Sequence, residues 1–229
     1  MLCIMTVVGI DACPGGWVGI VLDDAAHPTG VFGRTVPELL QAVSSVRLIT
    51  IDIPIGLPVT GSRAADHAAR AAVGPRWQSV FLTPIRAALE APTYHEANRL
   101  ARQQSGTGIS QQAYGLRAKI LEVDAWLPHA PAPVFEVHPE VCFAVMASAP
   151  LATSKKSWAG LERRRQLLRL AGIEFPSDLG EAGRRANADD VLDAAAAAWT
   201  ARRLVAGTAR PLPDPPEVGP DGRPVAIWA

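Results

Sequence analysis

The sequence predicts a mixed α/β domain in which helices cover a β-sheet. Three short apolar segments rich in β-branched residues follow one another near the start, separated only by turns. A short helical segment then leads to a nearly continuous apolar run at 47–53, which is typical of a strand buried on both faces. Segments with helical periodicity fill most of the remaining chain.

The first three strands are expected at 6–11, 17–22 and 31–36, and Cys13-Pro-Gly-Gly16 forms the first turn. A helix at 37–43 precedes the fourth strand at 47–53. A fifth strand is expected at 134–137, between two prolines. Further helices are expected at 63–73, 84–90, 94–104, 110–126, 140–146, 161–171 and 188–206.

The 229 residues suit one domain, 1–229, rather than two. Residues 62–130 are expected to form a helical insertion, because this stretch interrupts the strands and its charge differs. Residues 63–130 carry eight basic and five acidic residues, whereas the first 62 carry two and five. The tail at 207–229 is rich in proline, and its Pro-Asp-Gly turn suggests a terminal hairpin.

Composition excludes several classes of protein. Lys+Arg and Asp+Glu both number 22, so the chain lacks the basic excess of a protein that coats nucleic acid. A local basic patch is still compatible with this composition. No apolar run reaches the roughly 18 residues of a membrane span. The three cysteines have no CxxC spacing, and the start does not resemble a signal peptide. We therefore expect a cytoplasmic protein without a zinc site or a membrane partner.

Acidic residues stand where an apolar strand is expected. Asp11 ends the first strand, Asp52 interrupts the fourth and Glu136 lies within the fifth. A lone carboxylate in apolar surroundings is costly unless it is paired or binds a metal. One such acid would suit a cap or an acceptor of backbone N–H groups, but three on separate strands favour a functional site.

The last helix adds Asp190 and Asp193, which are three residues apart and therefore on one face. Asn187 is a natural N-cap, and acids in the first turn also complement the helix dipole, so a structural role is open for this pair. Asp193 lies beyond the first turn and directly precedes an alanine run that must pack on the sheet. We therefore expect Asp193 near the sheet.

Clustered carboxylates without His or Cys are the ligands that Mg²⁺ or Mn²⁺ requires. Two such ions about 4 Å apart activate water and stabilise the leaving oxygen during phosphodiester cleavage. The pattern therefore predicts a nuclease whose catalytic acids are Asp11, Asp52, Glu136, Asp190 and Asp193.

Four motifs in order resemble an uncharacterised family of predicted nucleases with the ribonuclease H fold. They are Gly9-Ile-Asp-Ala-Cys-Pro-Gly-Gly-Trp17, Ile51-Asp-Ile-Pro-Ile-Gly56, Phe135-Glu-Val-His-Pro-Glu-Val-Cys-Phe143 and Ala188-Asp-Asp-Val-Leu-Asp-Ala194. The resemblance implies a ribonuclease H-like, mixed five-stranded sheet whose first three strands are antiparallel, with helices on both faces. The layout of acids is also similar to Holliday-junction resolvases of the RuvC type, which are often dimers, so a homodimer is compatible with it.

By that resemblance, Asp11, Asp52, Asp190 and Asp193 are metal ligands and Glu136 is a further ligand or a neighbour of the metal site. The chain departs from true ribonuclease H, which takes a catalytic glutamate from its first helix. The acid of that helix here is Glu38, at its start, where a capping or dipole role is expected.

Other residues suggest how a substrate is held. Lys155, Lys156 and Arg163 belong to a basic cluster that would hold a nucleic-acid backbone, although a solvated helix face explains it equally well. His138 follows the Glu136 strand and would act as an acid or base on a leaving group, or play a structural role before Pro139.

Two alternatives to a nuclease stay open. The Gly-x-Asp-x-x-x-Gly-Gly turn also suits the phosphate-binding turn of the sugar kinase and actin superfamily, which needs two copies of this fold. A non-catalytic module that keeps the fold would bind a nucleotide or a protein partner. An open groove over the acids favours the nuclease, whereas an insertion covering them favours the module.

Overall fold

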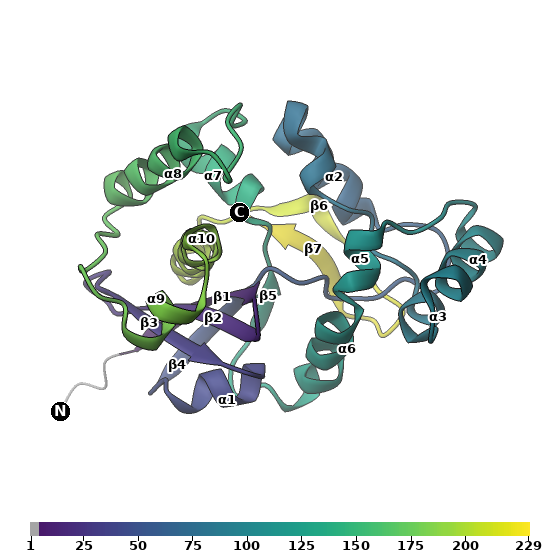
Figure 1. The fold of residues 1–229 in the computed structure, drawn as a ribbon, viewed down its shortest axis with the longest axis horizontal. Helices are drawn as coiled ribbons and strands as arrows, with labels where there is room; N and C mark the ends of the chain where they lie inside the picture. Colours follow the sequence, from purple (N-terminus) through teal and green to yellow (C-terminus); the bar gives the residue numbers. More distant parts are fainter. Residues whose placement is uncertain (1–4) are drawn as a thin grey trace.

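The computed structural model describes residues 5–229 and contains a five-stranded mixed sheet (Figure 1). Its strand order is β3-β2-β1-β4-β5; β1, β2 and β3 are antiparallel, while β4 and β5 run parallel to β1. This topology is ribonuclease H-like, as predicted. The strands are β1 (Thr6–Cys13), β2 (Gly16–Leu22), β3 (Pro28–Gly33), β4 (Val46–Ile51) and β5 (Val134–Glu136).

The third strand lies three residues earlier than predicted. Thr35 is the reason, because its side chain accepts a hydrogen bond from the backbone of Glu38 and caps α1 (Val36–Gln41). The helix therefore begins at Val36, and Arg34 and Thr35 precede it instead of extending the strand. Glu38 in turn accepts from the backbone of Arg34, which fits the capping role expected of it.

One face of the sheet is covered by α10 (Ala188–Val205), which is seen end-on in Figure 1. Alanines at 194–198 are buried on this face, and small side chains let helix and sheet approach closely. At Gly9 of β1, a Cβ atom would lie 2.0 Å from the backbone nitrogen of Ala198. The contact between β1 and α10 therefore requires glycine at this position.

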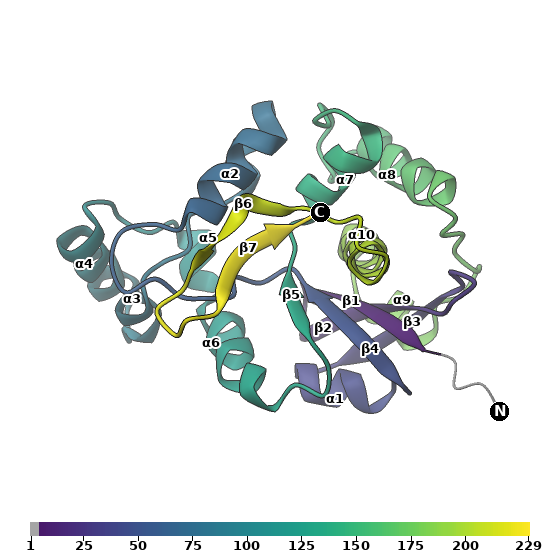
Figure 2. The same ribbon diagram turned by 180° about the vertical axis from the view of Figure 1, so that it is seen from behind.

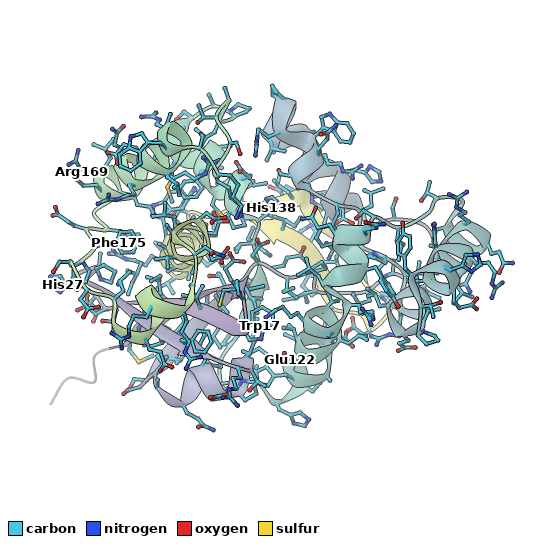
Figure 3. The ribbon with its side chains drawn as sticks, viewed as in Figure 1. Trp17, His27, Glu122, His138, Arg169 and Phe175 are labelled. Atoms are coloured by element: carbon cyan, nitrogen blue, oxygen red, sulfur yellow. The ribbon has the colours of Figure 1, made fainter. Side chains whose placement is uncertain are left out.

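The other face of the sheet is covered by α1 and α6 (Arg117–Trp126). Trp17 of β2 is fully buried there, and its indole nitrogen donates to Glu122 of α6 at 3.1 Å. Figure 3 shows these two side chains together. Glu122 also accepts from the backbone nitrogen of Val36, so one carboxylate joins β2, α1 and α6.

The helical stretch after β4 lies beside the sheet and carries its own small cluster of buried side chains (Figure 1). The predicted helix at 110–126 is divided near Gly115 into two. The elements of this stretch are α2 (Ala64–Val73), a 3₁₀ helix at Gly74–Ser79, α3 (Arg86–Glu90), α4 (Tyr94–Ser105), α5 (Gln111–Gly115), α6 and a 3₁₀ turn at Leu127–His129.

After β5 the chain forms α7 (Pro139–Ala147), α8 (Trp158–Leu170), α9 (Gly180–Arg185) and α10. Sequence reasoning missed α9, a short helix rich in glycine and charge. A separate antiparallel pair, β6 (Pro211–Val218) and β7 (Pro224–Trp228), closes the chain. Figures 1 and 2 both show this pair between β5 and α2, and Val137 forms a bridge with Trp228.

Among residues 5–229, no helix combines the length and apolar character needed to cross a bilayer. Cys13 and Cys142 are buried free thiols, and Cys3 lies outside the described residues.

Candidate active site

Two aspartates lie side by side at the ends of parallel strands. Residues of β1 and β4 pair up to Ile10 and Ile51, and the backbone nitrogen of Asp52 donates to the carbonyl of Ile10 at 3.0 Å. Side chains alternate along a strand, so Asp11 lies on the same face as Gly9, and Asp52 follows Thr50. Gly9 and Thr50 are both on the face that packs against α10, because Gly9 contacts the backbone of this helix and Thr50 donates to the Ala197 carbonyl. Asp11 and Asp52 are therefore on that face as well.

The last helix brings Asp193 to the same place. Asp193 lies one turn before Ala197, on the side of α10 that packs against β4, and it is only 2% exposed. Asp190 lies one turn earlier and lines the same cavity as Asp193 and Asp11. Its carboxylate accepts hydrogen bonds from the side chain and backbone of Asn187, at 2.8 and 3.3 Å, and thereby caps the helix.

Lys155 supplies positive charge to this cluster. It lies in the segment between α7 and α8, and its ammonium group is hydrogen-bonded to Asp193. Burial alone would lower the pKa of Lys155, but the negative charges of Asp193 and Asp11 raise it above its usual value. The lysine that was expected to bind substrate thus neutralises part of the acid cluster.

The carboxyl groups repel one another despite this lysine. Burial raises the pKa of Asp11 well above its usual value, and the charges of Asp52 and Asp193 raise it further. Burial likewise raises the pKa of Asp52 to about 7 and that of Asp193 to about 6, against the opposing effect of Lys155. One ammonium group does not balance three ionised carboxylates, so the fully ionised cluster is disfavoured and the acids hold protons to higher pH than usual.

The donor set fits a hard divalent cation in its chemistry, because Asp11, Asp52, Asp190 and Asp193 offer only oxygen ligands. Within residues 5–229, however, no three His, Cys, Asp or Glu side chains stand close enough together to form a ready-made metal site. Lys155 is bonded to Asp193, which is one of the expected ligands. Binding of an ion by three of these aspartates therefore requires their side chains to move closer together.

Glu136 lines the same cavity as the four aspartates, but its carboxylate is paired with an arginine. It pairs with Ile51 across β4 and β5, so it lies on the face of the sheet opposite Asp52. There it accepts two hydrogen bonds of 2.7 Å from Arg63, which is 3% exposed. Arg63 also bonds Asp66 of α2 and the carbonyl of Ile55. This buried ion cluster ties the helical insertion to the sheet.

The other predicted residues have separate positions. His138 directly precedes α7 and lines the cavity beside the aspartates; Figure 3 shows it near the centre of the molecule. Burial lowers the pKa of His138, and its Nδ1 atom is buried without a hydrogen-bond partner. Lys156 pairs with Asp189 at 2.6 Å, whereas Arg163 is exposed on α8 and does not line this cavity.

Sequence reasoning missed several charged residues of this region. Glu140 raises the pKa of Asp52 and Asp193, after the larger effects of burial and Lys155, and it forms two 2.8 Å bonds with the buried Arg164. Its position two residues after His138 was the available signal. Arg63 and Arg76 gave no comparable signal, because an arginine in a helical, more basic stretch usually faces solvent.

A cavity of about 260 Å³ lies beside the aspartates, close to the lower end of the roughly 300–1,000 Å³ of small-molecule sites. Asp11, Asp52, Asp190, Asp193 and Lys155 line one part of it. The insertion contributes much of the remaining lining, including Arg63, Asp66, Arg76, Ser79, Thr83 and Gln112. The acids therefore face a partly open cavity that residues of the insertion also line.

Comparison with protein families gives one match. The model of the family described as "Protein of unknown function (DUF429)" matches residues 9–218, a span that includes the four aspartates, Lys155 and the insertion. Neither the curated proteins nor the solved structures contain a match to this chain. Because the family model spans most of the sequence, the chain belongs to the DUF429 family.

Proposed function

We propose that this protein hydrolyses a phosphodiester bond with the help of Mg²⁺ or Mn²⁺. One observation carries the proposal: Asp11, Asp52 and Asp193 come from three separate elements to one end of the sheet, beside a cavity. Their mutual repulsion makes this placement costly to the fold. A bound divalent ion would remove that repulsion, so the proposed function explains why the acids are there.

Different residues of the chain would bind the ion and the substrate. Asp11, Asp52 and Asp193 would hold the ion, with Asp190 beside them at the helix start. Bound there, the ion would polarise the phosphate and lower the pKa of a water molecule. Lys155 would leave Asp193 and move its ammonium group to a phosphate oxygen of the substrate.

His138 would accept a proton rather than donate one. Its Nε2 atom lies 3.3 Å from the carbonyl of Ser79, which only accepts hydrogen bonds, so Nε2 carries the proton. The unpartnered Nδ1 atom then keeps its lone pair, and His138 lines the cavity. This assignment favours His138 as a base toward water over the action on a leaving group expected from the sequence.

The test is hydrolysis of phosphodiester substrates with Mn²⁺ and with EDTA, using wild type, Asp11→Asn and Asp24→Asn. Asp24 is an exposed aspartate outside the cavity and serves as the matched control. We expect turnover that requires Mn²⁺, is abolished by Asp11→Asn and is kept by Asp24→Asn. Activity that survives Asp11→Asn would refute the assignment.

Two observations favour a second function, nucleotide binding without catalysis. Lys155 already neutralises Asp193, and the insertion covers the acids as expected for a binding module. A module of this kind would bind a nucleotide in the same cavity and release it unchanged. Binding without any Mn²⁺-dependent product in the experiment above would favour it over the hydrolase.

A further inference from the structure

The cavity carries positive as well as negative side chains. Besides Lys155, Arg76 of the 3₁₀ helix at Gly74–Ser79 reaches it from the insertion. Arg76 pairs with Glu140 at 3.6 Å, and its Nε atom is buried and has no hydrogen-bond partner among residues 5–229. A guanidinium group with an unused donor beside a cavity suits a phosphate oxygen.

Two buried polar atoms of this lining lack partners, Nε of Arg76 and Nδ1 of His138. Buried polar atoms are nearly always hydrogen-bonded, so each exception needs an explanation. Both residues line the cavity, so a ligand bound there is the partner that we assign to these two side chains. The donor from Arg76 and the acceptor from His138 match a ligand that has an anionic group and a hydroxyl or water beside it.

The part of the insertion that lines the cavity is held to the sheet by buried ion pairs. Arg63, Asp66 and Glu136 are each at most 5% exposed and join α2 to β5. Asp66 also accepts from the backbone of Thr83 at 2.7 Å, which fixes the chain after the 3₁₀ helix that carries Arg76. Because separating a buried ion pair is strongly unfavourable, α2 is not expected to move away from the sheet when a substrate binds.

Asp11 and Asp193 are buried, with 6% and 2% of their surface exposed. To reach them, an internal bond of a double helix would have to pass the residues of the insertion that line the cavity. The volume of the cavity is also close to the lower end of the range for small-molecule sites. Resting on the proposed function, we infer that the substrate is a free phosphodiester of nucleotide size, held by Arg76 and Lys155, and not an internal bond of a polymer.

The first experiment compares substrates for one enzyme sample in Mn²⁺. The small substrate is the p-nitrophenyl ester of thymidine 5′-monophosphate, and the polymers are single-stranded and duplex DNA and RNA oligonucleotides. We expect cleavage of the small diester and intact polymers. Faster cleavage of an oligonucleotide than of the small diester would overturn the substrate class while leaving the hydrolase intact. No product from any substrate would refute the proposed function and this inference with it.

A second experiment measures binding without catalysis, by titration calorimetry with thymidine 5′-monophosphate in EDTA. Arg76→Gln is expected to weaken binding by about tenfold or more, the usual loss of a hydrogen bond to a charged group. Arg76→Lys keeps the charge and should lose less. Arg99→Gln is the matched control, since Arg99 is exposed on α4 and pairs with Glu96. Equal affinity of wild type and Arg76→Gln, with both folded by circular dichroism, would overturn the role of Arg76.

Discussion

Replacing Asp52 with asparagine is expected to stabilise the protein at alkaline pH when no divalent ion is present. The pKa of Asp52 is raised from 3.8 to about 7. A raised carboxyl pKa contributes stability that is complete below about pH 4 and is lost as the pH rises through 7. The rise corresponds to at most about 4 kcal/mol, because each tenfold change in proton affinity is worth about 1.4 kcal/mol. An asparagine side chain at this position carries no charge at any of these pH values, so the variant escapes this loss.

The assay is urea denaturation of wild type, Asp52→Asn and Asp24→Asn in EDTA at pH 5 and pH 8. Between these values the unfolding free energy of wild type should fall by more than that of Asp52→Asn, with a difference of roughly 1–3 kcal/mol. Coupling to Asp11 and Asp193 places the result below the upper limit. Asp24→Asn should follow wild type. An Asp52→Asn variant that is less stable than wild type at pH 8 would refute the reasoning and indicate a structural hydrogen-bond acceptor.

Three further variants test separate parts of the structure. Gly9→Ala should lower the unfolding free energy by about 3 kcal/mol or more, because the new Cβ would lie 2.0 Å from the backbone of α10. Gly115 has open space around it, so Gly115→Ala should be neutral or stabilising in the same thermal melts. Arg63→Met should cost roughly 3–5 kcal/mol by leaving Glu136 buried without its partner, and an unchanged melting temperature would contradict the proposed clamp. Lys155→Met should destabilise the metal-free protein and tighten Mn²⁺ binding measured by calorimetry; weaker binding would show that Lys155 does not compete with the ion.

The fold was predictable because its strongest signals are local. Apolar segments separated by glycine turns identify β1 and β2, and the continuous run before Asp52 identifies β4 as buried on both faces. The helix over 188–206 follows from its asparagine cap and alanine run. The third strand was displaced because Thr35 caps a helix, a competition between strand and cap that an apolar pattern does not resolve.

The candidate site was predictable only where strand alternation and helix spacing coincide. Asp11 and Asp52 end neighbouring strands, and Asp193 shares the helix face of Ala197. Glu136 looked equivalent along the chain, but its pairing with Ile51 places it on the other face of the sheet. That register depends on contacts between strands far apart in sequence, so no local pattern gives it.

The charges that surround the acids were the least predictable part. Lys155 comes from a loop between helices, and Arg76 comes from the insertion, so only the tertiary fold brings them to the cavity. The same holds for the Arg63 cluster, in which Arg63 and Glu136 lie 73 residues apart. Long-range ion pairs of this kind have no sequence spacing of their own.

The most direct test of the central claim is Mn²⁺ binding by the acid cluster, measured as thermal unfolding of wild type, Asp11→Asn and Asp24→Asn with increasing Mn²⁺. An ion at about 100 times its Kd adds roughly 2.7 kcal/mol, which is several degrees for a chain of this size. The account predicts that Mn²⁺ stabilises wild type and Asp24→Asn but leaves Asp11→Asn unchanged. Equal stabilisation of all three proteins, or of none, would contradict it.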